Sequence, residues 1–177
     1  MSARIIDGNA IAKVVRAEWK QRVEQLREIG VVPGLAVLIV GENPASQVYV
    51  RRKAKACEDI GIHSQKHEFP ANVEEREVLD RIAALNADPA IHGILVQLPV
   101  PPHFDSRRLL EAIAVEKDVD GFNLYNVGAL VAGDTVFPPC TPYGVQCLLE
   151  YSKIPISGQN VVVVGASNIV GKPMAML

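Results

Sequence analysis

The chain has 177 residues, of which 49% are hydrophobic and 21% are charged, and its formal net charge is −2. This composition is typical of a folded globular protein and argues against a disordered chain. The chain lacks the excess of basic residues that would indicate a nucleic-acid partner. It also has no apolar run that approaches the roughly 18 residues of a membrane-spanning helix. Because the N-terminus also lacks the apolar core of a signal peptide, we expect a cytoplasmic protein with no nucleic-acid or membrane partner.

The cysteines and histidines show no disulfide or metal-binding pattern. Cys57, Cys140 and Cys147 are odd in number and have no C-x-x-C spacing, so we expect reduced thiols with a structural role. His63 and His67 have the i, i+4 spacing of a helical zinc pair. The residues around them alternate like a strand, however, and no H-E-x-x-H motif is present, so we expect no metal site.

The first half of the chain alternates between helical and strand patterns. Apolar residues such as Trp19 and Val23 recur at helical spacing, whereas "GLAVLIVG" is a short apolar run bounded by glycines, which is typical of a buried strand. Asn43 and Pro44 then form a good cap and first-turn pair for a helix. The predicted elements are helices at about 9–29, 43–61 and 74–86, and strands at 34–41 and 63–69.

The second half continues this alternation and contains one long loop. Residues 91–100 predict a third strand that is ended by prolines, and residues 160–165, with four consecutive valines, predict a fourth. The loop at 115–140 is long for a compact domain, and loops of that length are often functional. Apolar strands that alternate with helices indicate an α/β fold with a parallel or mostly parallel sheet. The predicted helices lie at 105–114, at 141–151 and from about Ile169.

One of the four cations in "VYVRRKAKAC" differs from the others. On a helix with about 100° per residue, Val50 and Cys57 lie on the stripe that faces the sheet. Lys55 has acidic residues at i+3 and i+4, an ordinary exposed pairing, whereas the helical neighbours of Lys53 are uncharged and include Tyr49. Lys53 therefore lies at the edge of the core, either as a snorkelling side chain or as an acid or base with a lowered pKa.

Two polar features stand out in the strands and the long loop. Gln97 lies in an otherwise apolar strand and needs a hydrogen-bond partner, because an unpaired buried amide costs about 1–3 kcal/mol. Asp118 and Asp120 precede Gly121, where an Asx turn is the simplest explanation.

A third feature is the polar loop that follows the four valines. Gly165 and Gly171 bracket Ser167 in "VVVVGASNIVGKP", which is not the G-x-G-x-x-G pattern. As a bare pattern it is weak, but its place between a predicted strand and a predicted helix indicates a phosphate bound at the helix N-terminus.

Taken in order, these segments resemble the methylenetetrahydrofolate dehydrogenase/methenyltetrahydrofolate cyclohydrolase family. Their joint occurrence is highly specific, although each alone is not. The resemblance implies an enzyme of one-carbon metabolism that oxidises 5,10-methylenetetrahydrofolate with NADP and then hydrolyses the methenyl product to 10-formyltetrahydrofolate. The matching stretches are "ASQVYVRRKAKACEDIGI", "GILVQLPVP", "KDVDGFN", "PPCTPYGV" and "VVVVGASNIVGKP".

The resemblance also implies one folate site that serves both reactions. Lys53 is similar to the family's catalytic lysine, and Tyr49, one turn earlier, to a residue that lines the pterin pocket. Gln97 is similar to the residue that hydrogen-bonds and orients this lysine, and its neighbour Leu98 is expected at the same site. Asp120 is similar to the carboxylate that anchors the pterin ring.

For the cofactor, the resemblance implies NADP in a cleft between two lobes. Thr141 is expected near the nicotinamide, and Gly165, Ala166 and Ser167 are expected at the start of the phosphate loop. Many members of the family have Arg where this chain has Ala166, so the residue that would read the 2′-phosphate is not visible in the sequence. We expect NADP rather than NAD, because members with Ala at this position are known.

The resemblance divides the chain into two parts and implies a homodimer. Residues 1–140 are expected to form the folate-binding catalytic domain, and residues 141–177 a linker helix and the first portion of a Rossmann-type NADP-binding domain. A complete dinucleotide fold needs several more strands. We therefore expect the second domain to be incomplete here, and dehydrogenase activity to require the rest of it.

Three other interpretations remain open. A short-chain dehydrogenase also has a Tyr-x-x-x-Lys pair, which Tyr49 and Lys53 match, but its glycine-rich loop precedes the pair, whereas here the loop follows it. The chain is alternatively a dehydrogenase-only member of the family, or a non-catalytic module that binds folate or a nucleotide. An assay of methenyl-folate hydrolysis separates such a module from the enzyme.

Overall fold

A three-stranded parallel sheet lies at the centre of the computed structural model, which describes residues 3–177. Its strands are β1 (Gly34–Val40), β2 (His63–Phe69) and β3 (Gly93–Val96), in the spatial order β2-β1-β3. Leu35 of β1 pairs with Ser64 on one side and with Gly93 on the other, which sets the register. The predicted α/β class with a parallel sheet is confirmed.

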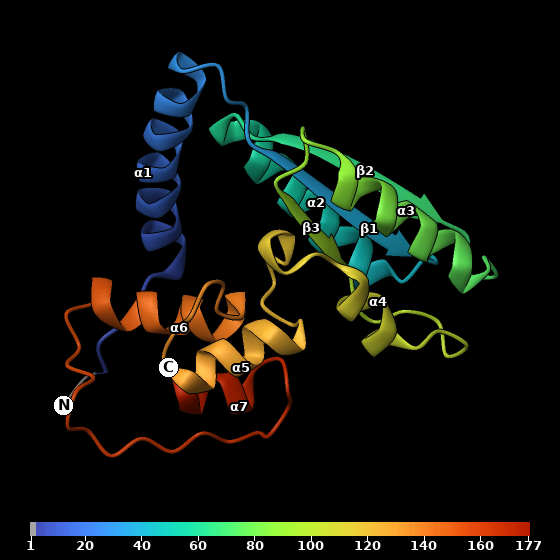
Figure 1. The fold of residues 1–177 in the computed structure, drawn as a ribbon. Helices are drawn as coiled ribbons and strands as arrows, with labels where there is room; N and C mark the ends of the chain where they lie inside the picture. The colour runs from blue at the N-terminus through green and yellow to red at the C-terminus, as the bar shows by residue number, and fades with distance from the viewer. Residues whose placement is uncertain (1–2) are drawn as a thin grey trace.

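The helices cover both faces of the sheet and form a further group beyond it. In Figure 1, α3 and α4 lie on one side of the strands, and α5, α6 and α7 lie together below them. None of the described helices is both long enough and apolar enough to cross a membrane. The bounds are α1 (Gly8–Glu28), α2 (Pro44–Ile60), α3 (Glu75–Ala87), α4 (Ser106–Ala112), the 3₁₀-helix η1 (Val115–Lys117), α5 (Leu124–Ala132), α6 (Cys140–Tyr151) and α7 (Gly171–Met176).

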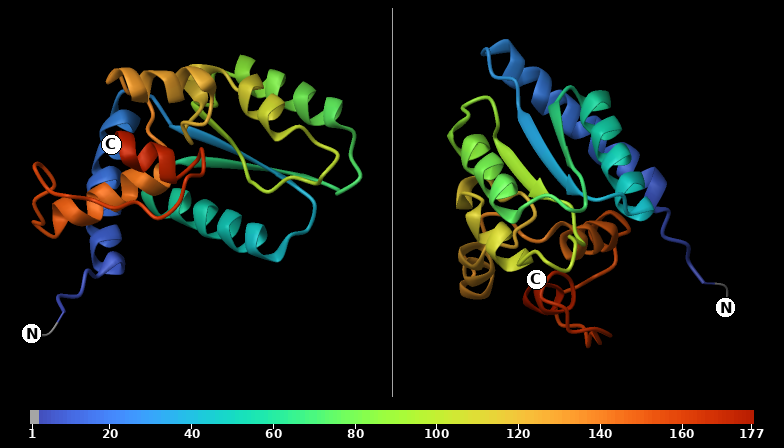
Figure 2. Two further views of the ribbon diagram at one scale, coloured as in Figure 1. Left: turned by 90° about the horizontal axis from the view of Figure 1, so that it is seen from below. Right: turned by 90° about the vertical axis from the view of Figure 1, so that its right-hand side faces the viewer.

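The two faces of β1 contribute to two separate parts of the core. Leu38 and Val40 are buried in a cluster with residues of α3 and α4, whereas Val37 and Ile39 pack with Val50 of α2 on the other face. The right-hand view of Figure 2 shows α2 and α3 on opposite sides of the strands. A strand that is covered on both faces has to be apolar at nearly every position, which explains the uninterrupted apolar run.

The helix α2 has clear start and stop signals. The side-chain oxygen of Asn43 accepts a hydrogen bond from the backbone N–H of Ser46 at 3.1 Å, and a proline occupies the first turn. Gly61 ends the helix in the left-handed conformation with a φ of 87°, which glycine adopts at little cost. Between these ends, Val50 and Cys57 are buried, so the stripe predicted to face the sheet does so.

The apolar stripe of α1 is not buried as a core-facing helix would require. Asp7 caps the helix by accepting hydrogen bonds from two backbone N–H groups of its first turn. Val23 is its one buried residue, and Trp19 is 51% exposed. The helix stands beside the sheet (Figure 1) and contacts α2 and α6. Most of its apolar side chains therefore do not reach the core.

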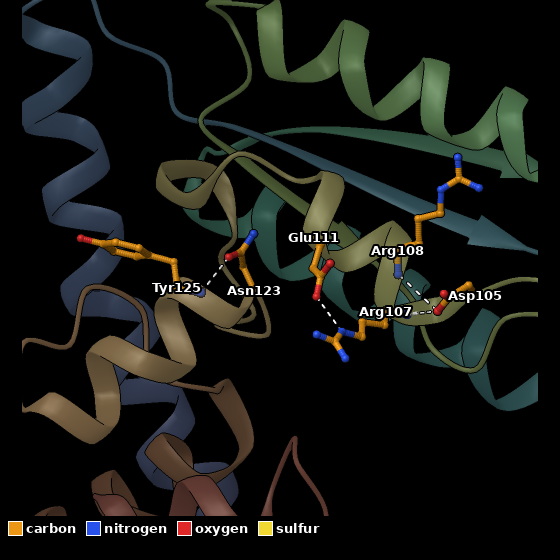
Figure 3. A network of polar contacts seen from close by, with 6 residues as sticks. All are labelled: Asp105, Arg107, Arg108, Glu111, Asn123 and Tyr125. Atoms are coloured by element: carbon orange, nitrogen blue, oxygen red, sulfur yellow. Dashed lines mark hydrogen bonds and ion pairs between the residues drawn. The ribbon is translucent and has the colours of Figure 1, made fainter.

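The predicted loop at 115–140 is partly helical, so that prediction was wrong in part. It contains η1 and α5. The side-chain oxygen of Asn123 caps α5 by accepting a hydrogen bond from the backbone N–H of Tyr125 at 2.9 Å (Figure 3). The same close-up shows Asp105 capping α4 through the backbone N–H of Arg107.

The predicted strand at 160–165 was wrong. These residues belong to an irregular connection (Figure 1), no described residue pairs with them as a strand, and Val162 and Val164 are 86% and 97% exposed. A run of valines forms a strand only where neighbouring strands complete its hydrogen bonds and helices cover its faces. Two other boundaries also differ, since β3 ends at Val96 and the last helix begins at Gly171.

Candidate active site

A cavity of about 880 Å³ lies along the α2 side of the sheet and extends to the start of α6. Its lining comes from segments that are far apart in the sequence. They include α1, α2, the strand β3 with the residues just before and after it, and the loop after η1. The fold brings all predicted folate-site residues and one of the predicted cofactor residues to this cavity. They are Tyr49, Lys53, Gln97, Leu98, Asp120 and Thr141.

Lys53 and Gln97 are joined by a hydrogen bond at this cavity. The Nζ atom of Lys53 donates to Oε1 of Gln97 at 3.3 Å. The other end of the amide is also fixed, because Nε2 of Gln97 donates to the carbonyl oxygen of Leu98 at 2.8 Å. The backbone N–H of Gln97 donates to the carbonyl oxygen of Leu38 at 2.8 Å, which continues the ladder beyond β3. The sheet therefore holds an amide oxygen in a fixed place beside the lysine.

The other cations of α2 lie outside this arrangement. Lys55 forms exposed ion pairs with Glu58 and Asp59 at 3.1 and 3.0 Å, as predicted. Arg52 is exposed, whereas Lys53 is half-buried. Lys53 forms no ion pair with the described residues, so its remaining N–H donors are free to bind a ligand.

Asp120 reaches the same cavity from the loop after η1. Burial raises the pKa of its carboxyl group, the nearby Lys53 ammonium group partly offsets this effect, and Asp118 raises the pKa further. A carboxylate in this position has lost much of its hydration and gains from hydrogen-bond donors that a ligand supplies. Asp120 and Lys53 therefore form a polar pair at a cavity that is otherwise largely apolar.

Gly121 fixes the turn that carries Asp120. Its φ is 69°, in the left-handed region, and a Cβ atom there would collide with the carbonyl oxygen of Phe137. Its backbone N–H donates to the carbonyl oxygen of Asp118 at 3.3 Å, which closes the turn. Glycine is therefore required both by the backbone conformation and by the close approach of the Phe137 segment.

Several cavity residues were not selected from the sequence. Trp19, Phe122, Phe137 and Cys140 also line the cavity. The aromatic residues come from separate segments and form no local pattern, so nothing short of the fold could place them together. Cys140 lies within the stretch "PPCTPYGV", but a single cysteine is no signal by itself.

The thiol of Cys140 connects α6 to the loop that carries Asp120. Its Sγ atom donates to the carbonyl oxygen of Val119 at 3.4 Å. Burial raises the pKa of the Cys140 thiol, and the Asp120 carboxylate raises it further. The thiol therefore stays protonated at neutral pH and acts as a hydrogen-bond donor.

The three residues predicted to begin the phosphate loop do not line the cavity, although Ile169, two residues after Ser167, does. Gly165, Ala166 and Ser167 are exposed. The hydroxyl oxygen of Ser167 accepts hydrogen bonds from the backbone N–H groups of Val170 and Gly171 at 3.1 and 3.3 Å. A Cβ atom at Gly171 would collide with the carbonyl oxygen of Gly165. The two glycines thus close a tight turn around Ser167.

Comparison with known families tests the resemblance that the sequence shows. Residues 6–120 match the tetrahydrofolate dehydrogenase/cyclohydrolase catalytic domain, and residues 139–177 match the NAD(P)-binding domain of the same family. The chain belongs to the tetrahydrofolate dehydrogenase/cyclohydrolase family. The predicted resemblance is confirmed, and the short-chain dehydrogenase interpretation is excluded.

Members of this family are similar to the chain over its whole length. The chain is 63% identical to the bifunctional protein FolD of Nitrosospira multiformis and 62% identical to that of Cupriavidus pinatubonensis, in each case over 177 residues. These residues are the whole of this chain and 62% of each relative. The chain thus spans less than two thirds of the length of the curated relatives that it matches.

Solved structures of the family have the same fold. Bifunctional FolD from Campylobacter jejuni superposes with a TM-score of 0.96 at 46% identity, over 99% of this chain and 62% of that one. The Trypanosoma brucei enzyme, solved with NADP cofactor and an inhibitor, gives a TM-score of 0.95 at 40% identity, over 99% of this chain and 61% of that one.

Proposed function

We propose that this protein oxidises 5,10-methylenetetrahydrofolate with NADP and hydrolyses the 5,10-methenyl product to 10-formyltetrahydrofolate. The observation that carries the proposal is the cavity of about 880 Å³, at which Lys53, held by Gln97, lies near Asp120. A largely apolar cavity with a few convergent polar groups is typical of a small-molecule site. The names of the relatives support the same pair of activities.

Asp120 is proposed to anchor the pterin ring of the folate. The pyrimidine part of a pterin presents adjacent N–H donors, and a carboxylate accepts such a pair through two charge-assisted hydrogen bonds. Leu98 and Gln97 also line the cavity, and Tyr49 contributes an aromatic side chain to its lining. The ring would thereby be held between a fixed acceptor and an apolar wall.

Lys53 is proposed to move the protons of the hydrolysis. A water oxygen forms a bond to the methenyl carbon and gives up one proton, after which the bond from this carbon to N5 breaks. The new hydroxyl group loses the second proton of the water as the C=O bond forms, N5 takes up a proton, and the carbon remains on N10 as the formyl group, so that one proton is released overall. Gln97 would position Lys53 for this role, because Leu98 fixes the amide from the other end.

NADP, when bound, would supply the hydride acceptor for the oxidation. The residues proposed to hold it are Thr141, which lines the cavity, and the loop of Gly165, Ala166 and Ser167. This loop fits the role, because the space where a Cβ atom of Gly165 would lie is open. A ligand could therefore approach the backbone there closely.

We also propose a cytoplasmic homodimer whose folate domain ends near residue 140. Cys57, Cys140 and Cys147 are all free thiols, which suits a reducing compartment. The match to the second family domain begins at residue 139. The formyl and methylene folates would serve purine, histidine and methionine synthesis. Sedimentation at several protein concentrations tests the dimer.

Two assays test the proposed function: hydrolysis is measured on the 177-residue chain, and oxidation on a chain that carries the whole NADP-binding domain. Loss of methenyl-folate absorbance above the buffer rate reports hydrolysis, and formation of NADPH from methylene-folate reports oxidation. Oxidation without hydrolysis would identify a dehydrogenase-only member of the family. Folate binding without either reaction would identify a binding module, and a chain that does not bind folate contradicts the proposal.

A further inference from the structure

Asp118 is a buried carboxylate for which the proposed function has no role. It is 1% exposed, while the neighbouring Asp120 is half-buried, and no other carboxylate among the described residues is buried. Asp118 forms no ion pair with the described residues and does not line the cavity. A buried charge is costly unless strong hydrogen bonds compensate it, so its bonding partners indicate what it does.

Both hydrogen bonds to the Asp118 side chain come from the start of α5. Its Oδ2 atom accepts from the backbone N–H of Asn123 and from Nδ2 of Asn126, each at 2.8 Å. Asn123 is the residue whose side chain caps α5 (Figure 3). The carboxylate therefore closes a bridge over residues 119–122, which connect η1 to α5 and include Asp120.

The N-terminal side of this bridge is fixed by other contacts. The Nζ atom of Lys117 donates to the carbonyl oxygens of Leu85, Asn86 and Asp88, at the C-terminal end of α3, at 3.1, 2.8 and 2.8 Å. The backbone of Asp118 also pairs with Ile94 of β3 as an isolated bridge. Residues 117 and 118 are thus attached to the sheet and to α3, whereas residues 119–122 are held by the bridge to α5 and by the hydrogen bond from Sγ of Cys140 to the carbonyl oxygen of Val119.

We propose that Asp118 is a positioning residue for Asp120, and that its hydrogen bonds to the start of α5 hold the intervening turn so that Asp120 reaches the folate cavity. That the ligand is a folate rests on the proposed function, whereas the role of Asp118 in holding the turn follows from the hydrogen bonds alone. The groups that face Asp120 are Lys53 of α2, Asp118 of its own loop and Cys140 of α6. Asp118 also raises the pKa of Asp120.

Two substitutions at position 118 separate its hydrogen bonds from its charge. Asp118→Asn retains an oxygen that can accept from both Asn123 and Asn126, but removes the negative charge. Asp118→Ala removes both. Asn126→Ala removes one of the two donors, and Asp134→Ala is the control, because Asp134 is exposed just beyond α5.

Amide hydrogen exchange of the ligand-free protein tests the turn directly. In Asp118→Ala, exchange of the Asn123 N–H should be about 10- to 100-fold faster than in the parent, which corresponds to loss of a hydrogen bond to a charged acceptor. In Asp118→Asn and Asp134→Ala it should change by less than about threefold. Equal protection of this amide in Asp118→Ala and the parent would overturn the proposal.

Titration with tetrahydrofolate tests the consequence for the site. Asp118→Ala should weaken binding by about tenfold or more, Asn126→Ala by less, and Asp118→Asn by little at neutral pH. The acid midpoint of binding should move to lower pH in Asp118→Asn, because the charge that raises the pKa of Asp120 is gone. Asn126→Ala retains the charge of Asp118 and should leave this midpoint unchanged, so the midpoint reports the charge of Asp118 and the affinity reports its hydrogen bonds.

Other outcomes are also decisive. An Asp118→Asn variant that binds as weakly as Asp118→Ala would overturn the proposal. If circular dichroism shows that Asp118→Ala is unfolded, Asn126→Ala decides, and unchanged folate affinity in that variant would overturn it. A parent chain that binds no folate would instead overturn the proposed function, while the exchange of the Asn123 amide still decides the role of Asp118 in the turn.

Discussion

We expect the charge of Asp120 to have opposite effects on the free energy of unfolding and on the proposed folate binding. Because burial raises its pKa above the ordinary value, the folded protein holds a proton on this carboxyl group more tightly than the unfolded chain does. Its contribution to stability therefore falls as the pH rises from the unfolded pKa through the folded pKa. Above that range, the fold contains an incompletely solvated carboxylate, and donors on the pterin ring would compensate it.

This balance predicts a distinctive result for Asp120→Asn. Folate affinity should fall by about 10- to 100-fold, because charge-assisted hydrogen bonds are lost. The free energy of unfolding at neutral pH should stay the same or rise, because a destabilising charge has been removed. Folate titration and denaturant unfolding measure the two effects, with the exposed Asp134→Asn as a control. Unchanged folate affinity would contradict the anchoring role.

Gln97 should affect the rate of hydrolysis more than it affects folate binding. Its amide oxygen lies 3.3 Å from Nζ of Lys53 and holds this group in place. In Gln97→Ala, we expect kcat to fall by up to about 10²-fold, the cost of misplacing a reacting group by about 1 Å, with a smaller change in KM. Gln65→Ala, on the edge strand β2, is the control. A loss confined to KM would contradict the positioning role.

At the scale of single elements, the turn around Gly121 is the most sensitive part of the site. Gly121→Ala should lower the free energy of unfolding by more than about 1 kcal/mol, because it combines a positive φ with a collision at Phe137. Gly128→Ala is a matched control in the middle of α5, where a Cβ atom meets nothing within 4 Å. It should stabilise the protein by roughly 0.5–1 kcal/mol.

The ordering of these two variants can be checked by denaturant unfolding and folate titration. Gly121→Ala should also weaken folate binding, whereas Gly128→Ala should not. Equal stability of the two variants would show that the turn tolerates a side chain and does not constrain Asp120.

The valines at 161–164 are an apolar segment that we expect to promote self-association of the protein. Val162 and Val164 are almost fully exposed in a stretch with high strand propensity. The double substitution of both residues by Lys should reduce self-association without lowering the melting temperature, because neither side chain packs against the core. Sedimentation velocity over a range of concentrations measures this. An equal degree of association in the parent and the variant would show that another surface is responsible.

Local sequence patterns predicted the elements whose signals are local. The caps of α2, the apolar run of β1 and the flank of Lys53 follow from helix and strand periodicity, and Gln97 stood out because an amide in an apolar strand needs a partner. The helix α5 was missed because Asn123 alone marks its start and Gly128 interrupts it. The strand at 160–165 was wrong because strand formation depends on neighbours that periodicity cannot supply.

At the scale of the whole molecule, the candidate site depends on several layers at once. Lys53 comes from a helix, Gln97 from the end of a strand and Asp120 from a loop that α3 and α5 hold in place. Trp19 and Thr141 join them from α1 and α6. These segments are distant in sequence, which is why the lining could not be derived from the sequence beyond the residues that the family pattern marks.

Hydrolysis of methenyl-folate by Lys53→Met and Lys55→Met tests the central claim most directly. The two residues lie on one helix and carry the same charge, but Lys53 faces the cavity beside Gln97, whereas Lys55 pairs with Glu58 and Asp59 in solvent. Lys53→Met should slow hydrolysis by about 10²–10⁴-fold while the fold survives, and Lys55→Met should be nearly silent. Equal and small effects of the two substitutions would contradict the account.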